Sequence, residues 1–376
     1  MKKILLFSFA VLAFAASCQK PQNDLFEPDP LDDGTPVKVM LGTNVLNATA
    51  KGSGPLEQFD NTVLSVFAID HASTNWTSGD PFLLKNYSVT ATGGSSASSF
   101  ETDKYYFETD KYYKDNVNYD FYGYYVDNID HQETNLKIDA QAVTLPVTIT
   151  GYEDILLATT DKGKDSQDAK DKAQDEGKTF NENRVYSAYS ARRDVVPNLV
   201  FKHMLTRLDF VFKTGEEVNQ DTRVEIVGIA VKSVINGTLT VAGDQKLVPA
   251  TEVETPLNLK YPTEQDVLKM PNEKDGFADF GSNGNSIMVY PKNGSYELTV
   301  KVRQSKKIGE TGETGETWTP GSVETRTFPI ALTSGSFKAG NKYEVTVITY
   351  GLEPVVVGVE LTDWALGDNT IIDSDK

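Results

Sequence analysis

Hydrophobic and polar residues alternate with a period of two along most of the chain after residue 36. In VKVMLGTNV this alternation puts Val37, Val39 and Leu41 on one face. In VTLPVTIT the apolar residues run in the same way from Val143 to Ile149. Successive side chains of a strand point to opposite faces, so this pattern predicts half-buried β-strands. Pro146 lies on the polar phase and cannot donate a backbone hydrogen bond, which predicts an edge position for its strand.

Four more segments show the same alternation, namely LDFVF (208–212), YELTVKVR (296–303), YEVTVITY (343–350) and VVVGVEL (355–361). Turns containing Gly, Asn and Pro separate them, and no long amphipathic helix interrupts the series. Many short strands with such turns are typical of β-sandwiches and barrels rather than of βαβ units. The fold class we predict is therefore all-β.

Three segments depart from this alternation. Residues 161–183 are polar with mixed charge and predict a surface loop with a short helix, or a disordered insertion. GETGETGETW, from Gly309 to Trp318, predicts a long hairpin tip. The tandem FETDKYYFETDKYY (100–113) repeats a unit of seven residues, which is too short for a solenoid repeat, and we interpret it as a local expansion of a strand and its loop.

The N-terminus has the features of a bacterial export signal. Two lysines precede an apolar run that ends in small residues and Cys18. About a dozen apolar residues are too few to span roughly 30 Å of hydrocarbon, so residues 1–17 are expected to be a signal peptide. FAASC resembles the lipobox of bacterial lipoproteins, which implies that Cys18 is acylated. Cys18 is also the only cysteine of the 376 residues, and a lone cysteine in an exported protein suggests a role other than a disulfide.

Composition adds two expectations. The formal net charge is −18, which argues against binding to nucleic acid or to an anionic lipid surface. Residues 18–36, rich in Pro, Asp and Gly, predict a flexible tether between the lipid and the folded part. Asp29, Asp32 and Asp33 lie in this tether. A calcium site there is possible in principle, but a solvated linker fits the prolines better.

Catalytic and metal-binding motifs are absent from the sequence. There is no serine elbow, no glycine-rich phosphate loop, no His-Glu-x-x-His and no cysteine cluster. Of the histidines His71, His131 and His203, the last shares the apolar phase of its strand, which favours a core or interface role. A pair of carboxylates spaced as in a glycosidase cannot be identified from sequence. We expect no enzymatic activity, no cofactor and no metal.

Aromatic residues supply one functional hint. In YDFYGYYVDN, Tyr119, Phe121 and Tyr125 share one face, and Tyr122 and Tyr124 share the other. A strand that is apolar on both faces is buried on both, covered by a partner, or offers rings to a ligand such as a sugar. Core packing is the simplest of the three interpretations.

The order of several motifs resembles that of the fimbrillin-like lipoproteins, the type V pilins of anaerobic Gram-negative bacteria. The matching segments are FAASC, NYDFYGYY, YEDILLATT, NLVFKHMLTRLDFVF, MVYPKNGSYELTV, FKAGNKYEVTVITY and VVVGVELTDWALGD. The resemblance implies two β-sandwich domains with Greek-key, transthyretin-like topology, at residues 37–196 and 197–376. It also implies a structural or adhesive pilus subunit at the outer membrane or cell surface, with other pilin subunits as partners and a host or bacterial ligand as a further possibility.

The resemblance further implies assembly by strand exchange. A protease specific for arginine or lysine removes the first strand of the N-terminal domain, and a strand of a neighbouring subunit fills the groove by β-augmentation. Here the first strand is VKVMLGTNV, and Lys51 in the following loop is the candidate processing site. Near the C-terminus Val355, Val357, Val359 and Leu361 share one face, which makes their segment the candidate donor strand.

An alternative from another functional class has the same anchor, acidity and β-content. A surface lipoprotein of a polysaccharide-uptake system would bind glycans by stacking them on exposed rings, and Trp76 and Trp318 are the candidates. Trp364, in LTDW, is expected to close one end of a sandwich instead. Polymer formation after proteolysis separates the two alternatives.

Overall fold

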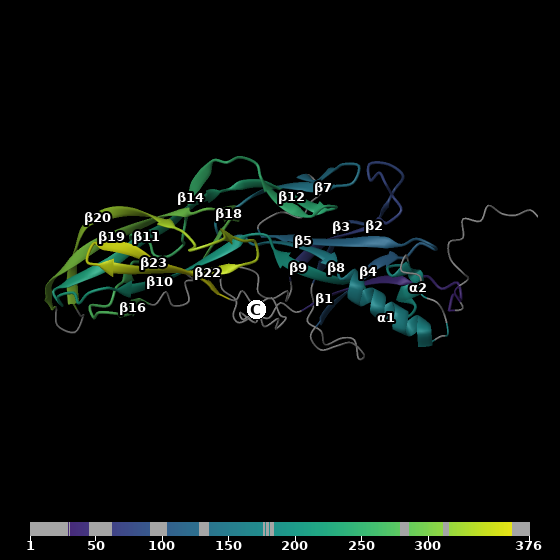
Figure 1. The fold of residues 1–376 in the computed structure, drawn as a ribbon, viewed down its shortest axis with the longest axis horizontal. Coiled ribbons are helices and arrows are strands. Elements are labelled where there is room, and N and C mark those ends of the chain that lie inside the picture. The colour runs from purple at the N-terminus through teal and green to yellow at the C-terminus, as the bar shows by residue number, and fades with distance from the viewer. Residues whose placement is uncertain are drawn as a thin grey trace, which may run out of the picture.

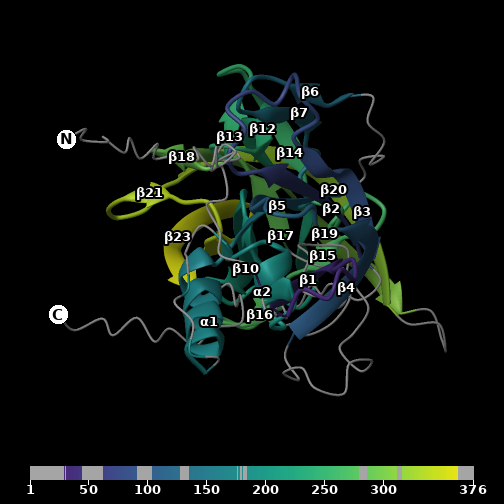
Figure 2. The ribbon, with the colours of Figure 1, turned by 90° about the vertical axis from the view of Figure 1, so that its right-hand side faces the viewer.

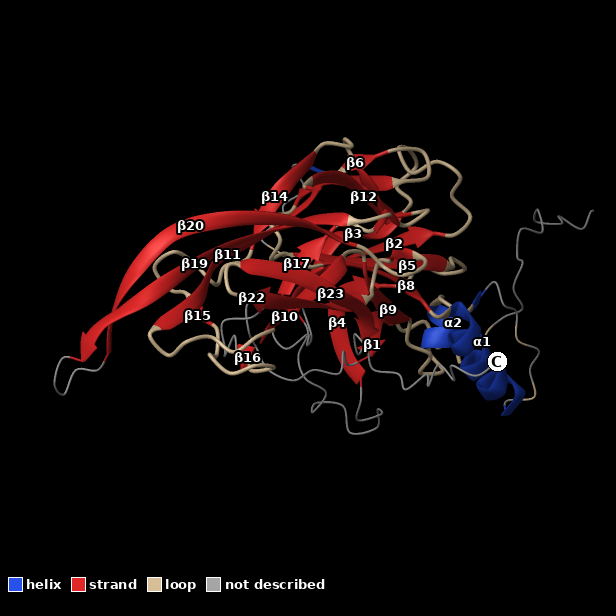
Figure 3. Cartoon of the chain, turned by 60° about the vertical axis from the view of Figure 1, so that its left-hand side comes forward, coloured by secondary structure: helices blue, strands red, loops and turns tan. Residues whose placement is uncertain are grey.

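The computed structural model describes residues 29, 31–44, 62–90, 104–127, 135–175, 177, 180, 184–278, 286–310 and 316–362. Strands dominate this part of the chain, as the colouring of Figure 3 shows. The all-β prediction is therefore confirmed. The predicted alternation is also borne out, because β10 (Thr206–Thr214) buries Leu208, Phe210 and Phe212 and leaves the intervening side chains half-exposed.

A seven-stranded sheet, which we call the N-terminal sheet, contains the first described strand. Its order is β3 (Phe82–Thr90), β2 (Val63–Asp70), β5 (Tyr119–Val126), β8 (Ile155–Thr160), β9 (Asn198–His203), β1 (Lys38–Asn44) and β4 (Lys104–Tyr112). Strand β1 lies between two neighbours, parallel to β9 and antiparallel to β4. The first described strand is thus an internal strand of its sheet.

Three further sheets complete most of the molecule. One has the order β13 (Lys246–Pro249), β12 (Asn236–Ala242), β7 (Val143–Thr148) and β6 (Lys137–Ile138). The second joins β16 (Phe277–Ala278), β10, β22 (Lys342–Tyr350) and β23 (Glu353–Thr362), with β17 (Ser286–Val289) also on β10. The third joins β14 (Glu254–Asn258), β11 (Thr222–Val234), β19 (Tyr296–Glu310) and β20 (Glu316–Ile330), with β15 (Leu268–Lys269) also on β11. Strands β18 (Lys292–Asn293) and β21 (Ser336–Phe337) form a separate pair.

Two apolar cores lie against these sheets. The larger contains Phe67 and Tyr124 of the N-terminal sheet together with Leu145 of β7, Phe210 of β10 and Val300 of β19. The smaller lies on the other face of the N-terminal sheet, around Leu41, Phe107, Phe121, Tyr186 and Leu199. Facing sheets that bury their alternate side chains in a common core are the basis of sandwich packing.

Strand β5 is buried on both faces, which decides between the interpretations of its aromatic residues. Phe121 packs edge-on against Tyr186, with ring centroids 5.7 Å apart, in the smaller core. Tyr124 stacks against Phe67 at 6.3 Å in the larger core. Tyr119, Phe121 and Tyr124 are each 1% exposed. The core interpretation is confirmed for this strand.

The polar segment 161–183 contains α1 (Lys162–Asp175), as the prediction of a short helix required. Asp161 accepts a hydrogen bond from the Lys164 backbone N–H at 3.2 Å, which satisfies one donor of the first turn. Asp165, Ala169 and Ala173, four residues apart, form the buried stripe of the helix. Small side chains let the helix lie close to the sheet, and Asp165 binds Tyr186 and the backbone N–H of Asn198.

The molecule is elongated (Figure 1). The helices α1 and α2 (Ala188–Ala191) lie at the right-hand end with β1 and β4, and the hairpin β19–β20 reaches the left-hand end. The view in Figure 2 looks onto the helical end. The expected hairpin at Gly309–Trp318 is confirmed by the pairing of β19 with β20.

The predicted domain boundary at residue 197 is not a boundary of strand pairing. Strand β9, which follows it, pairs with β8 and β1 of the N-terminal sheet. Strand β7, which precedes it, pairs with β12. The division into two domains stays a prediction. Strands from each side of residue 197 pair with strands from the other side.

The predicted edge position of the strand that contains Pro146 is wrong, because β7 lies between β12 and β6, although β6 is too short to reach Pro146. On one side β7 pairs with β12, where Pro146 lies opposite Thr238. On the other side β6 covers only Val143 and Thr144. Pro146 is exposed, and no described strand pairs with it on the β6 side.

Candidate strand-exchange site

The slot that β1 occupies is formed by β9 and β4. Gly42 donates its backbone N–H to Pro197 at 2.9 Å on the β9 side, and the Thr43 hydroxyl donates to the Leu199 carbonyl at 2.8 Å. On the β4 side the Thr109 hydroxyl donates to the Val39 carbonyl at 2.9 Å. Removal of β1 would therefore leave backbone groups of both neighbours unpaired.

The inner face of this slot is apolar. Val39 and Leu41 are 0% exposed and Thr43 is 1% exposed, whereas Lys38 on the other phase pairs with Glu108 at the surface. Phe107 of β4 and Leu199 of β9 belong to the same core. The residues that β1 covers are those that a replacement strand would have to cover.

Gly123 of β5 shows how closely this region is packed. A Cβ atom at this position would lie 2.9 Å from Cζ of Phe201 and 3.3 Å from Cδ1 of Leu199. The absence of a side chain thus lets two apolar residues of β9 lie across the sheet.

A cluster of arginines holds the segment that precedes β1. We call Arg184, Arg192 and Arg193, together with Tyr189, the arginine cluster. Arg192 and Arg193 donate to the two oxygens of Asp29, at 3.1 Å to Oδ2 and 3.0 Å to Oδ1. The second Nη atom of Arg192 lies 2.7 Å from Oδ1 of Asp32. Two carboxylates of one short turn are therefore bound at once.

Both sides of these ion pairs are held in place. The Asp29 side chain is 4% exposed and that of Arg193 is 2% exposed. Arg193 donates to the Tyr189 carbonyl at 2.8 Å, and its guanidinium lies 3.6 Å from the centroid of the Tyr189 ring. Arg184 also lies over this ring, at 3.9 Å. On the carboxylate side, the Asp32 N–H donates to the Asp29 carbonyl at 3.0 Å, which closes a turn.

The electrostatics of Asp29 follow from these contacts. Burial alone would raise the pKa of its carboxyl group. Hydrogen bonds from Arg193, the Leu31 backbone and Arg192, with the positive charge of Arg193, outweigh burial and hold the pKa below the usual range. Asp29 is thus a bound carboxylate, whereas the sequence predicted a solvated tether. That prediction is wrong for the side chain of Asp29, whereas residues 31–36 are exposed, and the tether as a whole stays a prediction.

The candidate donor strand is β23, at the edge of its sheet. It pairs with β22 in antiparallel register, Val345 opposite Val359 and Tyr343 opposite Leu361. Val359 is half-buried and Leu361 is 62% exposed. The side chains of Val355 and Val357 lie outside the described part of the chain, although their backbone belongs to β23.

Several predicted residues fall outside the described ranges, namely Cys18, Lys51, His131 and Trp364. The predictions for lipid attachment at Cys18 and for processing at Lys51 remain predictions. No helix of the described residues is long and apolar enough to cross a membrane.

The described histidines have carboxylate neighbours. His203 is 3% exposed, and its Nδ1 lies 2.8 Å from Oδ2 of the fully buried Asp154. His71, at the surface, lies 2.8 Å from Asp120. Among the described residues, no group of three His, Cys, Asp or Glu side chains is placed to hold a metal ion. His203 occupies the core position that its strand phase predicted.

The tryptophans proposed for glycan stacking do not form an open platform. Trp76 is 9% exposed and packs against Tyr122 at 6.3 Å. Trp318 is half-buried, and the Arg223 guanidinium lies 4.4 Å from its ring centroid. Neither ring is free to stack on a sugar in the manner that the alternative requires.

Sequence reasoning missed the arginine cluster. The adjacent basic pair Arg192 and Arg193 and the acidic pair Asp29 and Asp32 are both visible in the sequence, but about 160 residues separate them. Opposite charges far apart in sequence give no pairing signal without a fold. Only the turn and the sheet bring them together.

A family model described as fimbrillin-like matches residues 55–364. No curated protein matches the chain. Among solved structures, a fimbrial protein from Bacteroides vulgatus is 12% identical with a TM-score of 0.47, and 86% of this chain covers 99% of that one. The fimbrial anchor protein Mfa2 from Porphyromonas gingivalis is 11% identical with a TM-score of 0.35, and 88% of this chain covers 99% of that one. These two similarities are too distant to carry an argument. The family model spans most of the sequence, and the chain belongs to the fimbrillin-like family.

Proposed function

We propose that this chain is a structural or adhesive subunit of a cell-surface pilus and has no enzymatic activity. It is exported as a lipoprotein, held at the outer membrane through acylated Cys18, and assembled by strand exchange with other pilin subunits. Membership of the fimbrillin-like family supports the pilus or adhesion role. The observation that carries the exchange mechanism is the internal position of β1, because only an internal strand leaves a two-sided slot when it is removed.

In this mechanism a protease cuts at Lys51, which lies in sequence between β1 and β2. The released segment, which precedes the cut, contains β1. The slot then presents two unpaired edges and an apolar face, a combination that recruits another strand. Because Val39 and Leu41 are buried, that strand must supply apolar side chains at these two positions.

The replacement strand is β23 of a neighbouring copy. Residues 39–43 read VMLGT and residues 355–359 read VVVGV, so apolar residues and a glycine recur in the same order. With Gly358 in the place of Gly42, Val355, Val357 and Val359 take the places of Val39, Leu41 and Thr43. Each apolar side chain that becomes buried contributes about 1.5–3 kcal/mol before the costs of association and ordering.

The position of β23 favours its release. As an edge strand it pairs on one side only, with β22. It follows a turn at Gly351, whose φ is +58°, a conformation that glycine adopts without strain. Opening this turn moves β23 outward without unfolding β22. A released strand of this kind can pair with the open edges of a neighbour through its backbone hydrogen bonds.

Proteolysis of the purified chain tests this proposal. Limited trypsin digestion is followed by gel electrophoresis under mild conditions and by N-terminal sequencing of the products. We expect a ladder of polymers whose subunits begin after Lys51. The Lys51→Gln variant should remain uncut at this site and monomeric.

Complete cleavage at Lys51 without polymers would contradict the exchange mechanism, as would polymers whose subunits keep β1. Binding of soluble glycans without polymers would instead favour the polysaccharide-uptake alternative. Lipid attachment is tested separately, because Cys18→Ala should abolish metabolic labelling with palmitate. Label that persists in this variant would refute acylation at Cys18.

A further inference from the structure

Arg192 of the arginine cluster binds two carboxylates, and both belong to the segment that the proposed processing removes. Asp29 and Asp32 precede β1, and both leave with it if the chain is cut after β1. Arg192 would lose both carboxylates, and Arg193 would lose its ion pair with Asp29. A guanidinium presents its N–H donors in the geometry that a carboxylate accepts. The processed protein therefore gains a vacant carboxylate-binding site beside the vacant slot.

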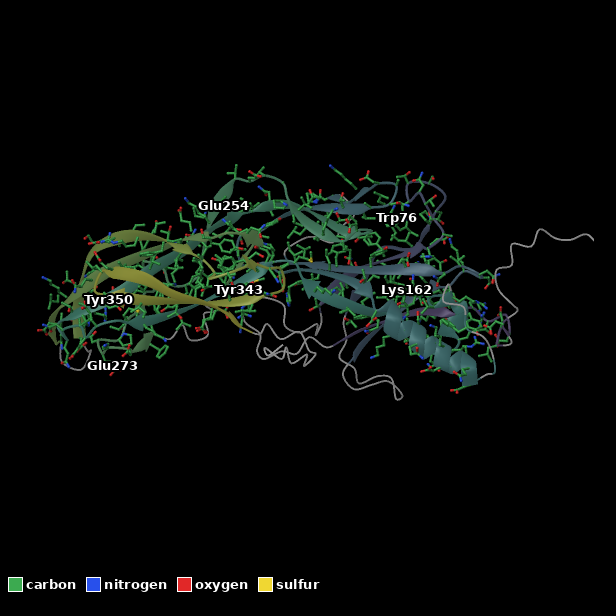
Figure 4. All side chains as sticks on the ribbon, in the orientation of Figure 1. Trp76, Lys162, Glu254, Glu273, Tyr343 and Tyr350 are labelled. Carbon is green, nitrogen blue, oxygen red and sulfur yellow. The ribbon has the colours of Figure 1, made fainter. Side chains whose placement is uncertain are left out.

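The opposite end of the molecule carries an excess of exposed carboxylates. Tyr350 and Glu273 lie at the left-hand end, far from Lys162 at the start of α1 (Figure 4). Five acidic residues, Glu216, Glu217, Glu273, Asp275 and Glu353, are exposed around the turns at this end. Two lysines, Lys213 and Lys274, accompany them. Carboxylates thus predominate at one end, and the arginine cluster lies at the other.

Glu216 lies beside the turn that leads into β23, and Glu217 follows it in the chain. The Gly215 N–H donates to the Thr349 carbonyl at 2.8 Å, which joins their loop to the end of β22. A Cβ atom on Gly351 would lie 3.9 Å from Oε1 of Glu216. These glutamates therefore stay next to the start of β23 when the turn at Gly351 opens.

The direction in which β23 enters the slot places the acidic end of the donor copy beside the arginine cluster of the acceptor copy. The N-terminal end of β1 lies beside the arginine cluster, because the turn before β1 binds Arg192 and Arg193. A donor strand that follows the matched order of residues 39–43 enters the slot from this end. The residues that precede β23 in the donor then lie where the turn at Asp29 lay in the acceptor.

We propose that the arginine cluster is a carboxylate-binding site for a second copy of this chain, and that it receives Glu216 and Glu217 once the segment before Lys51 has left. This rests on the proposed function. One end of each copy binds the opposite end of the next, and such a contact propagates as a filament when it does not close into a ring. The donor strand supplies apolar contacts, and the glutamates fix its direction and register.

Charge exchange on the full chain, cut as above, tests the site. We expect Arg192→Glu to slow polymer growth about tenfold or more, because like charges then face each other. Glu216→Arg with Glu217→Arg should have a similar effect. All three substitutions in one chain should restore growth to within about threefold of the wild type. The matched control, Glu252→Arg with Glu264→Arg, changes two exposed glutamates in other loops and should leave growth unchanged.

Two results would overturn the site while leaving strand exchange intact. One is normal growth of both single-sided variants. The other is rescue of Arg192→Glu by Asp368→Arg or Glu313→Arg rather than by the changes at Glu216 and Glu217, which would make the C-terminal segment or the hairpin tip the occupant. Far-UV circular dichroism of each uncut variant confirms that it is folded.

A second measurement keeps the site testable if cutting yields no polymer at all. In the cut chain the cluster is probed with a peptide of residues 214–219, which contains both glutamates. We expect this peptide to bind the cut wild type, to bind Arg192→Glu at least about tenfold more weakly, and to bind less tightly with added salt. Absence of binding to the cut wild type would refute the site, and the uncut wild type, in which Asp29 and Asp32 still hold the arginines, is the control.

Discussion

The first and last described strands, β1 and β23, have nearly the same sequence pattern and opposite settings. Strand β1 lies between two neighbours and buries Val39 and Leu41 completely. The turn that precedes it is held by the ion pairs of Asp29. Strand β23 has one neighbour and leaves Leu361 62% exposed. Loss of β1 opens a slot, whereas release of β23 breaks a single ladder. The same alternating pattern thus occurs in a strand with two neighbours and in an edge strand, and in the proposed exchange the first is replaced and the second is donated.

The largest expected effect comes from placing charges on β23. Val357→Asp with Val359→Asp should abolish polymer formation after cutting, since carboxylates cannot be buried in an apolar slot without a partner. The N-terminal sheet should stay folded because β23 is not one of its strands. Gel electrophoresis and hydrogen exchange measure the two effects. Ile308→Asp with Val323→Asp, on the exposed hairpin, is the control. Polymers from the β23 variant, or its general unfolding, would show that β23 pairs only within its own chain and is not donated.

A second prediction contrasts one leucine from each strand. Leu41→Ala should lower the free energy of unfolding of the uncut chain by about 2–5 kcal/mol, because a fully buried side chain leaves a cavity. Leu361→Ala should change it by less than about 0.5 kcal/mol, since Leu361 is mostly exposed. Urea unfolding measures both values. Equal effects would show that β1 and β23 contribute alike to the uncut monomer.

A third prediction concerns acid release of the segment before β1. The pKa of Asp29 is lowered in the folded chain, so its ion pairs stabilise the docked segment above the ordinary pKa, about 3.9. This stability is lost as the pH falls through the lowered pKa of the folded state. The charged groups that face Asp29 are Arg192, Arg193 and Arg184.

Hydrogen exchange of residues 31–37 as a function of pH measures this release. Protection should fall at acidic pH in the wild type. It should be low at every pH in Asp29→Asn, which has no carboxylate to titrate. Protection that is independent of pH in the wild type would show that Asp29 does not hold the segment.

The smallest expected effect concerns one hydrogen bond between β1 and β9. Thr43→Val removes the hydroxyl that donates to Leu199 at 2.8 Å and should cost about 0.5–1.5 kcal/mol of unfolding free energy. Thr90→Val, at an exposed position of β3, is the matched control and should be close to neutral. Thermal unfolding resolves the difference if both variants are measured together. An unchanged unfolding free energy in Thr43→Val would show that this hydrogen bond does not stabilise β1 in the slot.

The sequence predicted which segments form strands better than it predicted which strands pair with one another. Period-two alternation identified strands such as β10 and β22 because each buries one face against a core. The aromatic residues of β5 predicted burial on both faces for the same reason. Alternation says nothing of which strands pair, so the shared strands around residue 197 and the internal position of β1 required the structure.

The candidate site was predicted only in part. The pattern of β1 and of residues 355–361 was visible in the sequence, as were the lysine and cysteine chosen for processing and lipidation. The arginine cluster was not, since its charges meet only across the folded chain. The proline-rich, acidic composition around Asp29 predicts a solvated side chain, because segments of this kind usually remain in solvent.

The position of β23 after cutting tests the account most directly, and disulfide trapping can locate it. In a Cys18→Ser background one preparation carries Glu360→Cys, and the other carries Lys104→Cys on β4. Asn44 pairs with Lys104, and residue 360 takes the place of residue 44 when Gly358 replaces Gly42. Cutting and mixing the two preparations should therefore give a disulfide between copies. Glu108→Cys, opposite Met40, reports the reversed direction, and Glu344→Cys in the Glu360→Cys chain reports pairing with β22. Efficient trapping at position 104 is the predicted result, and trapping only with position 344 of the same chain would contradict strand exchange.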